Sequence, residues 1–259
     1  MATVLKERLY TRVVGRRILS YKELSSTMDL AAQEAREGTI EGTVVLATEQ
    51  TMGRGRLQRT WVSRPGNLLL SIVFYPSLKE LPYLSMLPSL AVVRAIVGET
   101  GLAPDIKWPN DILIMGKKVA GVLVENTLEG DAISYAIVGI GINIAMDTSE
   151  IPEIAPIATS LDLESGQNLD PAKILRRVLQ ELDKLYVAVS EGVSPVEEWR
   201  GHLGTLGKRV TIQWGNEVVS GLAEGVNDTG HLLLRRDDGG RVDLPGGEVT
   251  FQLLAEDST

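Results

Sequence analysis

The segment Gly53 to Trp61 reads GRGRLQRTW and carries three arginines and two glycines. The glycines allow the backbone to expose N–H groups and to pass close to a ligand. The arginines place three permanent positive charges on one loop, and a bound phosphate or carboxylate offsets their repulsion. The segment therefore predicts an anion-binding loop, with a solvated surface loop as an equal alternative on these residues alone.

A second polar cluster is Lys107-Trp108-Pro109-Asn110-Asp111, just before a predicted strand. Proline favours extended geometry in the residue before it, which puts Lys107, Asn110 and Asp111 at the mouth of that strand. Asp111 suits Mg²⁺, which binds one or two carboxylates together with water and substrate phosphate. Asn110 suits a phosphate or a ribose. A simple β-turn with charged edges is the competing interpretation.

Two further segments carry candidate ligand contacts. In Gly116-Lys117-Lys118-Val119-Ala120-Gly121 the adjacent lysines face opposite sides of an extended chain, so Lys118 can face a pocket. Gly121 permits close approach of a ligand. The run Gly139-Ile140-Gly141-Ile142-Asn143 lacks the third glycine of a dinucleotide fingerprint and precedes no clear helix. We interpret it as a central strand against which a nucleotide packs, with Asn143 as a polar handle.

Composition limits the chemistry further. The 259 residues carry a formal net charge of -8, which disfavours general DNA binding because that affinity depends on phosphate neutralisation. There is no cysteine and there are two histidines, so thiol nucleophiles, disulfides and multi-histidine metal sites are not expected. We find no signal peptide and no stretch approaching the ~20 apolar residues of a membrane span, so a cytoplasmic protein without a membrane partner is expected.

The elements that must position these residues are mixed in type. The first residues, to about Lys22, predict a solvated, partly strand-like segment. A helix is expected from Ser26, with Asp29 completing a capping box, to about Ala35. Further helices are expected over 84–100, 170–189 and 194–202, and a loop over 147–170 precedes the second of them. Strands are expected over 43–48, 68–75 and 132–145, with a hairpin of 111–115 and 119–126 that turns at residues 116–118.

From about Leu206 the pattern changes to short apolar runs separated by glycine-rich turns. Runs of four to six residues at this spacing predict a small all-β, SH3-like barrel. We therefore predict an α+β fold: a catalytic domain over 1–205 with a mixed β-sheet backed by helices, then the barrel over 206–259. The expected barrel strands are 210–214, 217–222, 232–235, 241–244 and 249–253.

Taken in order, these motifs resemble the biotin protein ligase family, the biotin–[acetyl-CoA-carboxylase] ligases. Ser26-Thr27 is followed by Glu49-Gln50, GRGRLQRTW, KWPND, KKVAGVLVE, GIGIN and the C-terminal barrel, over roughly residues 20–256. Two departures stand out: Gln58 replaces a common glycine, and Met28 replaces an asparagine present in many members. Because few residues precede Ser26, the resemblance implies the monofunctional type without an N-terminal DNA-binding domain.

The resemblance also implies the site. Catalysis falls to Lys118 and Arg56, and the metal to Asp111. Biotin contacts fall on Ser26, Thr27, Gln50, Gly53, Arg54, Gly55, Arg56, Lys118 and Gly121. ATP contacts fall on Arg56, Arg59, Trp61, Lys107, Asn110 and Asn143.

The implied reaction uses ATP as co-substrate and Mg²⁺ to make biotinyl-5′-AMP. A lysine of a biotin carboxyl carrier domain then receives the biotin. The family pattern also implies a homodimer. Two alternatives remain: a lipoate or octanoate ligase, whose cysteine and Arg-Arg-x-x-Gly-Gly-Gly loop are absent, and a biotin sensor, which needs no Mg²⁺ site.

Overall fold

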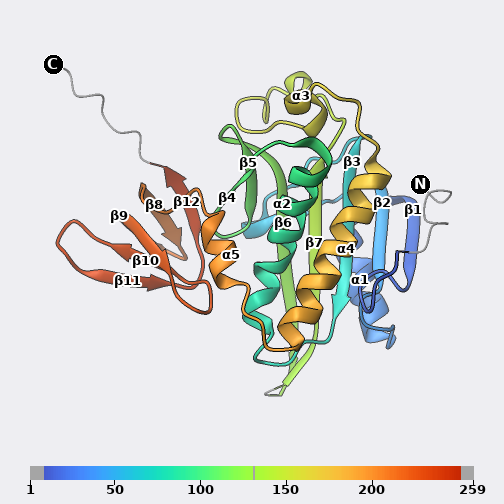
Figure 1. Cartoon of the computed structure of the whole chain (residues 1–259), viewed down its shortest axis with the longest axis horizontal. Coiled ribbons are helices and arrows are strands. Elements are labelled where there is room, and N and C mark those ends of the chain that lie inside the picture. Colours follow the sequence, from blue (N-terminus) through green and yellow to red (C-terminus); the bar gives the residue numbers. More distant parts are fainter. Residues whose placement is uncertain (1–8, 131, 252–259) are drawn as a thin grey trace.

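The computed structural model describes residues 9–130 and 132–251 of the chain. Within them seven strands form one sheet, in the order β1-β2-β3-β7-β6-β5-β4 (Figure 1). β1 is parallel to β2 and the other neighbouring strands are antiparallel, so the sheet is mixed, as predicted. Its strands are β1 (Ile18–Leu24), β2 (Val44–Gln50), β3 (Asn67–Phe74), β4 (Asp105–Lys107), β5 (Asp111–Ile114), β6 (Lys117–Glu129) and β7 (Ala132–Asn143).

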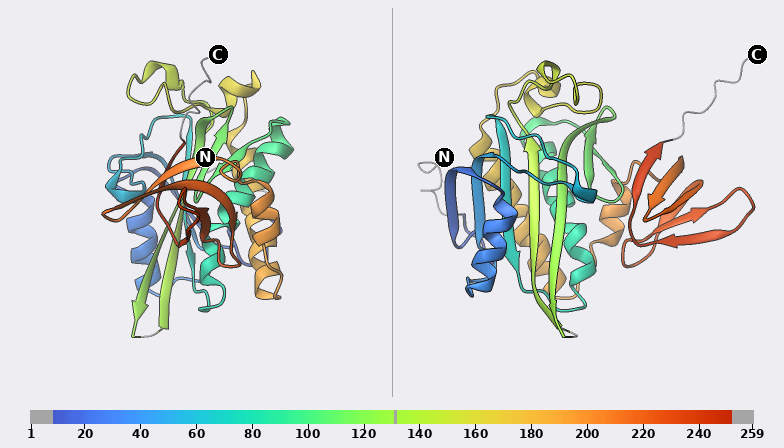
Figure 2. Two further views of the ribbon diagram at one scale, coloured as in Figure 1. Left: turned by 90° about the vertical axis from the view of Figure 1, so that its left-hand side faces the viewer. Right: turned by 180° about the vertical axis from the view of Figure 1, so that it is seen from behind.

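Helices cover both faces of this sheet. α1 lies on one face, whereas α2 and α4 lie on the other, as the opposite views show (Figure 1, Figure 2). Side chains alternate along a strand, so Val45 packs with α1 while Leu46 packs in the larger core with α2 and α4. The helices are α1 (Thr27–Arg36), α2 (Leu87–Thr100), α3 (Leu161–Ser165), α4 (Pro171–Ser190) and α5 (Val196–Gly201), with short 3₁₀ turns η2 (Arg56–Gln58), η3 (Leu81–Ser85) and η4 (Thr148–Glu150).

α1 begins as predicted, because Ser26 Oγ accepts a hydrogen bond from Met28 N at 3.2 Å and caps the helix. The predicted capping box is wrong. The Asp29 carboxylate accepts a hydrogen bond from Arg54 at 2.5 Å instead of turning back to the cap. The helix terminus therefore points its first residues, and Asp29 with them, toward the arginine-rich loop.

Residues Leu81–Thr100 form the most apolar helical stretch, made of η3 and α2. The prediction that no segment approaches a membrane span is wrong by composition, since this stretch is long and apolar enough to cross one. In the structure 61% of its most apolar window is buried, and α2 packs against α4 and the sheet as a core helix does. Gly101, with a φ of 73°, ends α2 as predicted.

α4 also begins as predicted, with Asp170 Oδ1 accepting a hydrogen bond from Ala172 N at 2.9 Å ahead of Pro171. The Asp183 carboxylate on its inner face accepts three backbone hydrogen bonds, at 2.7 to 2.9 Å, from the N–H groups of residues 12–14. These bonds fasten the N-terminal segment to the helix. The strand-like part of that segment is β1, and residues 1–8 lie outside the described range.

The β5–β6 hairpin turns at Met115 and Gly116, not over residues 116–118 as predicted. Both turn residues have positive φ, 49° and 80°, as a tight two-residue hairpin loop requires. Lys117 and Lys118 therefore belong to β6, where Lys117 is exposed and Lys118 is half-buried. The prediction that the two lysines face opposite sides is confirmed.

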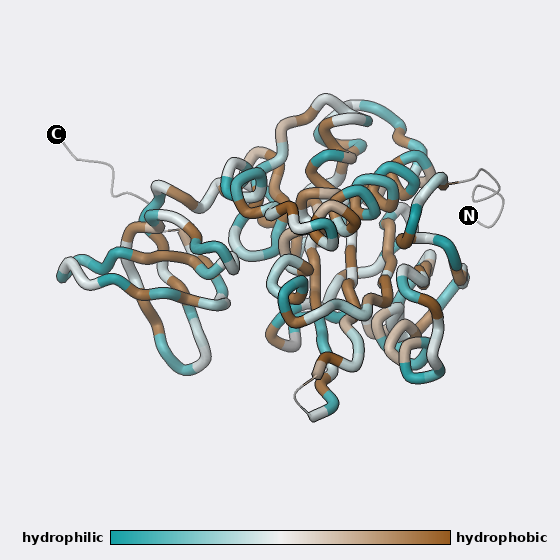
Figure 3. The backbone as a smooth tube through the Cα atoms, turned by 60° about the horizontal axis from the view of Figure 1, so that its bottom comes forward, coloured by the Kyte–Doolittle hydropathy of each residue, from teal (hydrophilic) through white to brown (hydrophobic). Residues whose placement is uncertain are grey.

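The remaining strands form a second sheet, antiparallel throughout, in the order β11-β10-β9-β8-β12. Its strands carry many hydrophobic residues (Figure 3), buried positions alternate with more exposed ones along β8 and β10, and the buried side chains make a small core, as the SH3-like prediction requires. The predicted residues Gln252 and Leu253 lie outside the described range, and a domain boundary at 205/206 stays a prediction. The strands are β8 (Arg209–Trp214), β9 (Glu217–Val226), β10 (Leu232–Arg235), β11 (Arg241–Leu244) and β12 (Glu248–Phe251).

Candidate active site

A cavity of about 520 Å³ opens on the α1 face of the large sheet. β3, β6 and β7 form its floor, the arginine-rich loop lies over it, and residues 247–251 of the second sheet reach its edge. Of the predicted site residues Gly53 alone does not line it. Those that do are Ser26, Thr27, Gln50, Arg54, Gly55, Arg56, Arg59, Trp61, Lys107, Asn110, Asp111, Lys118, Gly121 and Asn143.

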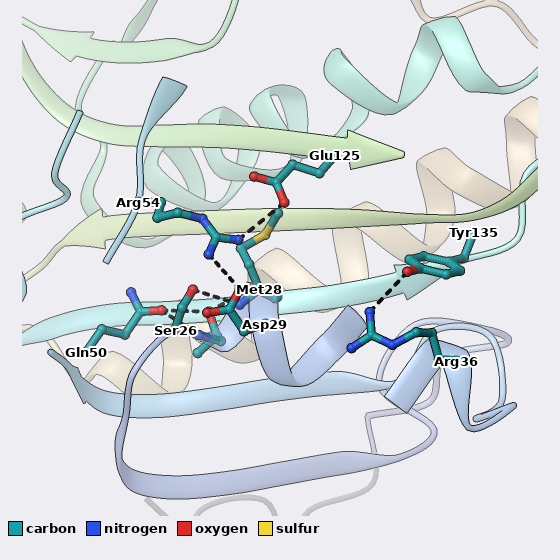
Figure 4. Close-up of polar contacts among 10 residues, drawn as sticks. Ser26, Met28, Asp29, Arg36, Gln50, Arg54, Glu125 and Tyr135 are labelled. Carbon is teal, nitrogen blue, oxygen red and sulfur yellow. Dashed lines mark hydrogen bonds and ion pairs between the residues drawn. The ribbon is translucent and has the colours of Figure 1, made fainter. Parts of the chain in front are cut away.

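One end of the cavity is uncharged and polar. Thr27 donates from its backbone N and its Oγ1 to Gln50 Oε1, at 2.6 and 3.0 Å (Figure 4). The same Thr27 Oγ1 lies 2.7 Å from Ser71 Oγ, which is fully buried. The sequence analysis missed Ser71, although it is a lone hydroxyl within the apolar run of β3. This cluster can recognise a small neutral group that both donates and accepts hydrogen bonds.

The loop Gly53–Trp61 is closed by its own backbone. Trp61 N donates to Gly53 O at 3.0 Å, and Gly55 N donates to Arg59 O at 2.7 Å. Neither glycine has a positive φ; the left-handed residue is Leu57, with a φ of 54°. A Cβ at Gly53 would lie 2.8 Å from Trp61 O, so this glycine serves close packing. The side chain of Gln58 lies outside the described part of the chain.

Arg54 fastens this loop to the body of the domain. Its guanidinium donates to Asp29 Oδ1 at 2.5 Å and to Glu125 Oε2 at 3.3 Å (Figure 4). The hydrogen bond to Asp29 is the main cause that raises the pKa of Arg54. Since two carboxylates already balance this charge, Arg54 holds the loop against α1 and β6.

A stripe of glycines on β6 and β7 brings the loop directly onto the sheet. A Cβ at Gly141 would lie 2.6 Å from the indole of Trp61, and one at its cross-strand partner Gly121 would lie 3.1 Å from that ring. A Cβ at Gly139 would lie 2.6 Å from Met28 Sδ. The buried Trp61 Nε1 has no hydrogen-bond partner among the described residues. An unpaired buried donor in a cavity is suited to an acceptor on a ligand.

The charged centre of the cavity lies beside this indole. Lys118 Nζ is 2.6 Å from Asp111 Oδ1 and 5.3 Å from the centroid of the Trp61 ring. Arg56 donates to Asn110 Oδ1 at 3.0 Å. Two residues that lie 54 positions apart in the chain therefore meet at one point, as the family resemblance implied when it assigned both to ATP.

Burial lowers the pKa of Arg56 and that of Lys107. The carboxylates of Asp111 and Glu248 counteract part of this effect on both groups, whereas Lys118 lowers the pKa of Lys107 further by repulsion. Besides Arg54, which has its own two carboxylate partners, four cations line the cavity with these two carboxylates: Arg56, Arg59, Lys107 and Lys118. Its surplus of positive charge, within a chain of net charge -8, favours an anionic ligand.

Trp108 ties the central motif to the second sheet. Its backbone N donates to Thr205 Oγ1 and its Nε1 donates to Gly230 O, both at 2.9 Å. The peptide bond from Trp108 to Pro109 is cis. Beyond it, Asn110 Nδ2 donates to Val122 O at 2.6 Å, which anchors the motif to β6. The segment that carries the polar side chains at 107, 110 and 111 is thus anchored to β6 on one side and to residues 205 and 230 on the other.

The second sheet adds two residues that the sequence analysis missed. Glu248 forms an ion pair with Arg59, and the Phe251 ring lies 5.4 Å from Lys107 Nζ. The pair Gly246-Gly247 before them was interpreted as a turn signal alone. The turn also delivers a carboxylate and a ring to the mouth of the cavity.

Asn143, at the end of β7, is buried, and its Nδ2 donates to Thr159 O at 3.0 Å. That bond holds the segment that follows β7 against the sheet. Asn143 therefore helps to shape the cavity wall, whatever it contacts in a ligand.

The donor set limits which metal the cavity suits. No group of three or more His, Cys, Asp or Glu side chains that suits a metal ion occurs in residues 9–130 and 132–251. Asp111 offers one carboxylate, and its Oδ1 contacts Lys118. Mg²⁺ is commonly bound by one or two carboxylates together with substrate phosphates. Asp111 therefore fits Mg²⁺ as a single ligand that acts together with a nucleotide.

Comparison with protein families finds two matches. Residues 21–143 match the biotin/lipoate A/B protein ligase family, and residues 205–251 match the biotin protein ligase C terminal domain. The first match covers β1 to β7, and the second covers β8 to β12.

Individual relatives agree with these matches. The chain is 37% identical over 237 residues to the bifunctional ligase/repressor BirA of Bacillus subtilis, covering 89% of this chain and 73% of that protein. It is 34% identical over 215 residues to the biotin–[acetyl-CoA-carboxylase] ligase of Paracoccus denitrificans, covering 80% and 89%. Among solved structures, the biotin protein ligase from Aquifex aeolicus in complex with biotin and ATP is similar, with a TM-score of 0.77, 30% identity and coverage of 92% and 99%.

Proposed function

The chain belongs to the biotin protein ligase family, and we propose that the cavity between its two sheets is where biotin and ATP react. It is an ATP-dependent biotin–[acetyl-CoA-carboxylase] ligase, which forms biotinyl-5′-AMP and then transfers biotin to an acceptor lysine. The family match over residues 21–143 is shared with lipoate ligases, and the biotin-specific match over residues 205–251 favours the biotin enzyme.

The observation that carries the proposal is the surplus of positive charge in the cavity. In the first step a biotin carboxylate oxygen bonds to the α-phosphorus of ATP, and pyrophosphate leaves with the electrons of the broken P–O bond. Both reactants are anions, so catalysis consists mainly of positioning and charge neutralisation. Lys118 contacts the biotin carboxylate and the α-phosphate, while Arg56 and Arg59 hold phosphate oxygens.

Biotin lies along the glycine stripe with its ureido ring at the polar end. Ser26, Thr27 and Gln50 bind that ring, and Gly55 contributes backbone from the loop above. Gly53 does not line the cavity and acts through the loop, which it closes by accepting a hydrogen bond from Trp61 N. The backbone at Gly121 approaches the ligand, because no side chain intervenes. Arg54 contributes by holding the loop through its two ion pairs.

The nucleotide occupies the end next to the second sheet. Lys107 and Asn110 contact its phosphates or ribose, Asn143 closes the wall, and the unpaired Trp61 Nε1 donates to it. Asp111 would hold Mg²⁺, which neutralises phosphate charge when bound. The mixed anhydride hydrolyses in water, so the loop over residues 53–61 also shields the product of the first step.

In the second step the ε-amine of a lysine on a biotin carboxyl carrier domain attacks the acyl carbon, and AMP leaves. The use of ATP and of a carboxylase as acceptor favours a cytoplasmic location. The acidic net charge of -8 argues against general DNA binding.

We also propose a homodimer that pairs through an edge of the large sheet. β1 and β4 are its edges, and a bridge from Ile106 to Leu203 already covers part of β4. β1 is therefore the better candidate. Light scattering across a protein concentration series tests the homodimer, with Tyr21→Pro on β1 as the variant. A wild-type mass that stays at one chain throughout contradicts the homodimer.

The function is tested by mixing the protein with labelled biotin, ATP, Mg²⁺ and a biotin carboxyl carrier domain. We expect label on the carrier only when ATP is present. Replacing biotin with lipoate separates the two branches of the family. Transfer of lipoate in preference to biotin, or binding of biotin without any transfer, contradicts the proposal.

A further inference from the structure

Three large apolar side chains are exposed around the mouth of the cavity. Leu57, on the loop above it, is 62% exposed, and Ile157, on the segment after β7, is 66% exposed. Both line the cavity. Met115, at the tip of the β5–β6 hairpin, is 89% exposed, and the next residue, Gly116, lines the cavity as well. We call Leu57, Met115 and Ile157 the apolar collar.

The collar is placed close to the reacting centre. Lys118 N donates to Ile157 O at 2.8 Å, and Met115 lies in the turn that leads into the same strand. A side chain that approaches Lys118 across the β5–β6 turn or the segment after β7 therefore comes close to the collar.

The backbone at two collar positions is unfavourable for the residue present. Leu57 has a φ of 54° and Met115 a φ of 49°, a region that bulky residues avoid. The only other non-glycine residue with positive φ in the described chain is Tyr10. Asn-Gly is the favoured sequence for a turn like Met115-Gly116. The turn therefore carries an exposed apolar side chain at a position where asparagine is favoured, and the turn geometry does not require that side chain.

We propose that the apolar collar docks the carrier domain around its acceptor lysine, by burying these three side chains against that domain. This inference rests on the proposed function, because the lysine amine must reach the acyl carbon of the adenylate beside Lys118. Lys117 lies next to Met115, is exposed, and has no ion-pair partner among the described residues. It adds a positive charge at the rim that suits an acidic side chain on the same carrier surface.

Met115→Asn tests the collar without disturbing the cavity, because the Met115 side chain is exposed and asparagine suits the turn. Two acceptors are compared: the carrier domain, and hydroxylamine, a small amine that needs no docking surface. We expect KM for the carrier domain to rise roughly five- to tenfold, while biotin-dependent pyrophosphate release and hydroxamate formation stay unchanged. Met115→Leu, which keeps an apolar side chain, should retain most of the wild-type KM.

Leu128→Thr is the matched control, since Leu128 is 59% exposed on β6 and, unlike Met115, has no chain neighbour that lines the cavity. It should change neither acceptor reaction. An unchanged carrier KM in Met115→Asn overturns the collar, and so does an equal loss with both acceptors. A fall from dimer to monomer in that variant assigns the surface to a second copy and also overturns it. Failure of the wild-type protein to release pyrophosphate contradicts the proposed function instead.

Discussion

The acids of α4 and the cations of the cavity are both buried to a large extent, but only the acids have enough partners to offset their burial. Glu181 is 4% exposed and contacts three cations, from Arg94, Arg177 and Lys184, at 2.9 to 3.3 Å. Burial alone raises its pKa, but the hydrogen bonds from Lys184 and Arg94 lower it overall. Asp183, 6% exposed, accepts three backbone hydrogen bonds.

In the cavity the balance is reversed. Arg56 and Lys107 are partly buried with pKa values lowered mainly by that burial, and the available carboxylates do not offset it. Removing one partner from a buried, fully paired charge is strongly destabilising, and a buried charge that its partners do not offset already costs stability. The comparison teaches that the α4 acids are there for folding and that the cavity cations are there for a ligand. Substitutions in the two regions should therefore separate activity from stability.

The largest effect is expected from Lys118→Ala. Removing the cation that contacts both reacting groups should lower kcat for biotin-dependent pyrophosphate release by about 10²- to 10³-fold. Lys118→Arg keeps the charge but shifts its position, so its kcat should lie between that of the wild type and that of Lys118→Ala. The urea midpoint of unfolding should stay within the error of the wild-type value. A destabilised Lys118→Ala protein would place Lys118 with the structural charges and break the comparison.

The reverse pattern is expected from Asp183→Ala. It leaves three backbone N–H groups without their charged acceptor. We expect the free energy of unfolding to fall by about 3 kcal/mol, measured by urea titration. Pyrophosphate release per folded molecule, assayed at low temperature, should not change. A loss below about 1 kcal/mol would show that solvent replaces this carboxylate easily.

A moderate effect is expected from pH through Lys107, whose pKa lies below its ordinary 10.5 because of burial. Lys107 therefore loses its proton at a lower pH than a solvent-exposed lysine. As pH rises through that shifted pKa, Lys107 loses the positive charge that we propose contacts ATP. The KM for ATP should therefore increase by roughly tenfold. The free energy of unfolding should instead rise over the same pH range, because burial penalises the charged form of Lys107 and deprotonation relieves that penalty.

The variant Lys107→Met tests both the effect of pH on ATP binding and its effect on stability. Its KM for ATP should be high at neutral pH and should lack the alkaline rise, while its unfolding free energy should be equal to or above that of the wild type. An alkaline rise that persists in Lys107→Met assigns the titration to another group.

The smallest effect is expected from Arg12→Ala. The Arg12 side chain pairs with Glu191 beside α4, but the two side chains are 71% and 60% exposed. Such exposed pairs contribute little, and we expect a change of less than about 0.5 kcal/mol in unfolding free energy. Because the backbone N–H of Arg12 still donates to Asp183, this variant is the control for Asp183→Ala. If Arg12→Ala lowered the unfolding free energy as much as Asp183→Ala does, the solvent exposure of a charge would not predict its contribution to stability.

Local signals predicted most of the fold. β10 and β11 match the predicted runs at both ends, and the caps at Ser26 and Asp170 appear as expected. These features depend on residues that are neighbours in the chain, so composition and spacing are enough to find them. The residues of the cavity were predictable because the motifs, taken in order, resemble one family, and that resemblance implied the site.

Contacts between distant residues were not predictable in the same way. Asp29 looked like part of a capping box, but its partner is Arg54, 25 positions away. Glu248 is 189 positions from Arg59, and nothing near either residue indicates the other. Ser71 had a local signal, a hydroxyl in an apolar strand, whose meaning depends on the position of Thr27. Pairing of this kind is set by the tertiary fold.

The most direct test of the central claim is the identity of the nucleotide released when the purified protein is given ATP, Mg²⁺ and biotin. If the cavity cations join the biotin carboxylate to the α-phosphate, the products are AMP and pyrophosphate. Their release should require biotin and should be accompanied by biotinyl-5′-AMP that hydroxylamine traps. Release of ADP and phosphate, or release of AMP at the same rate without biotin, would contradict the account.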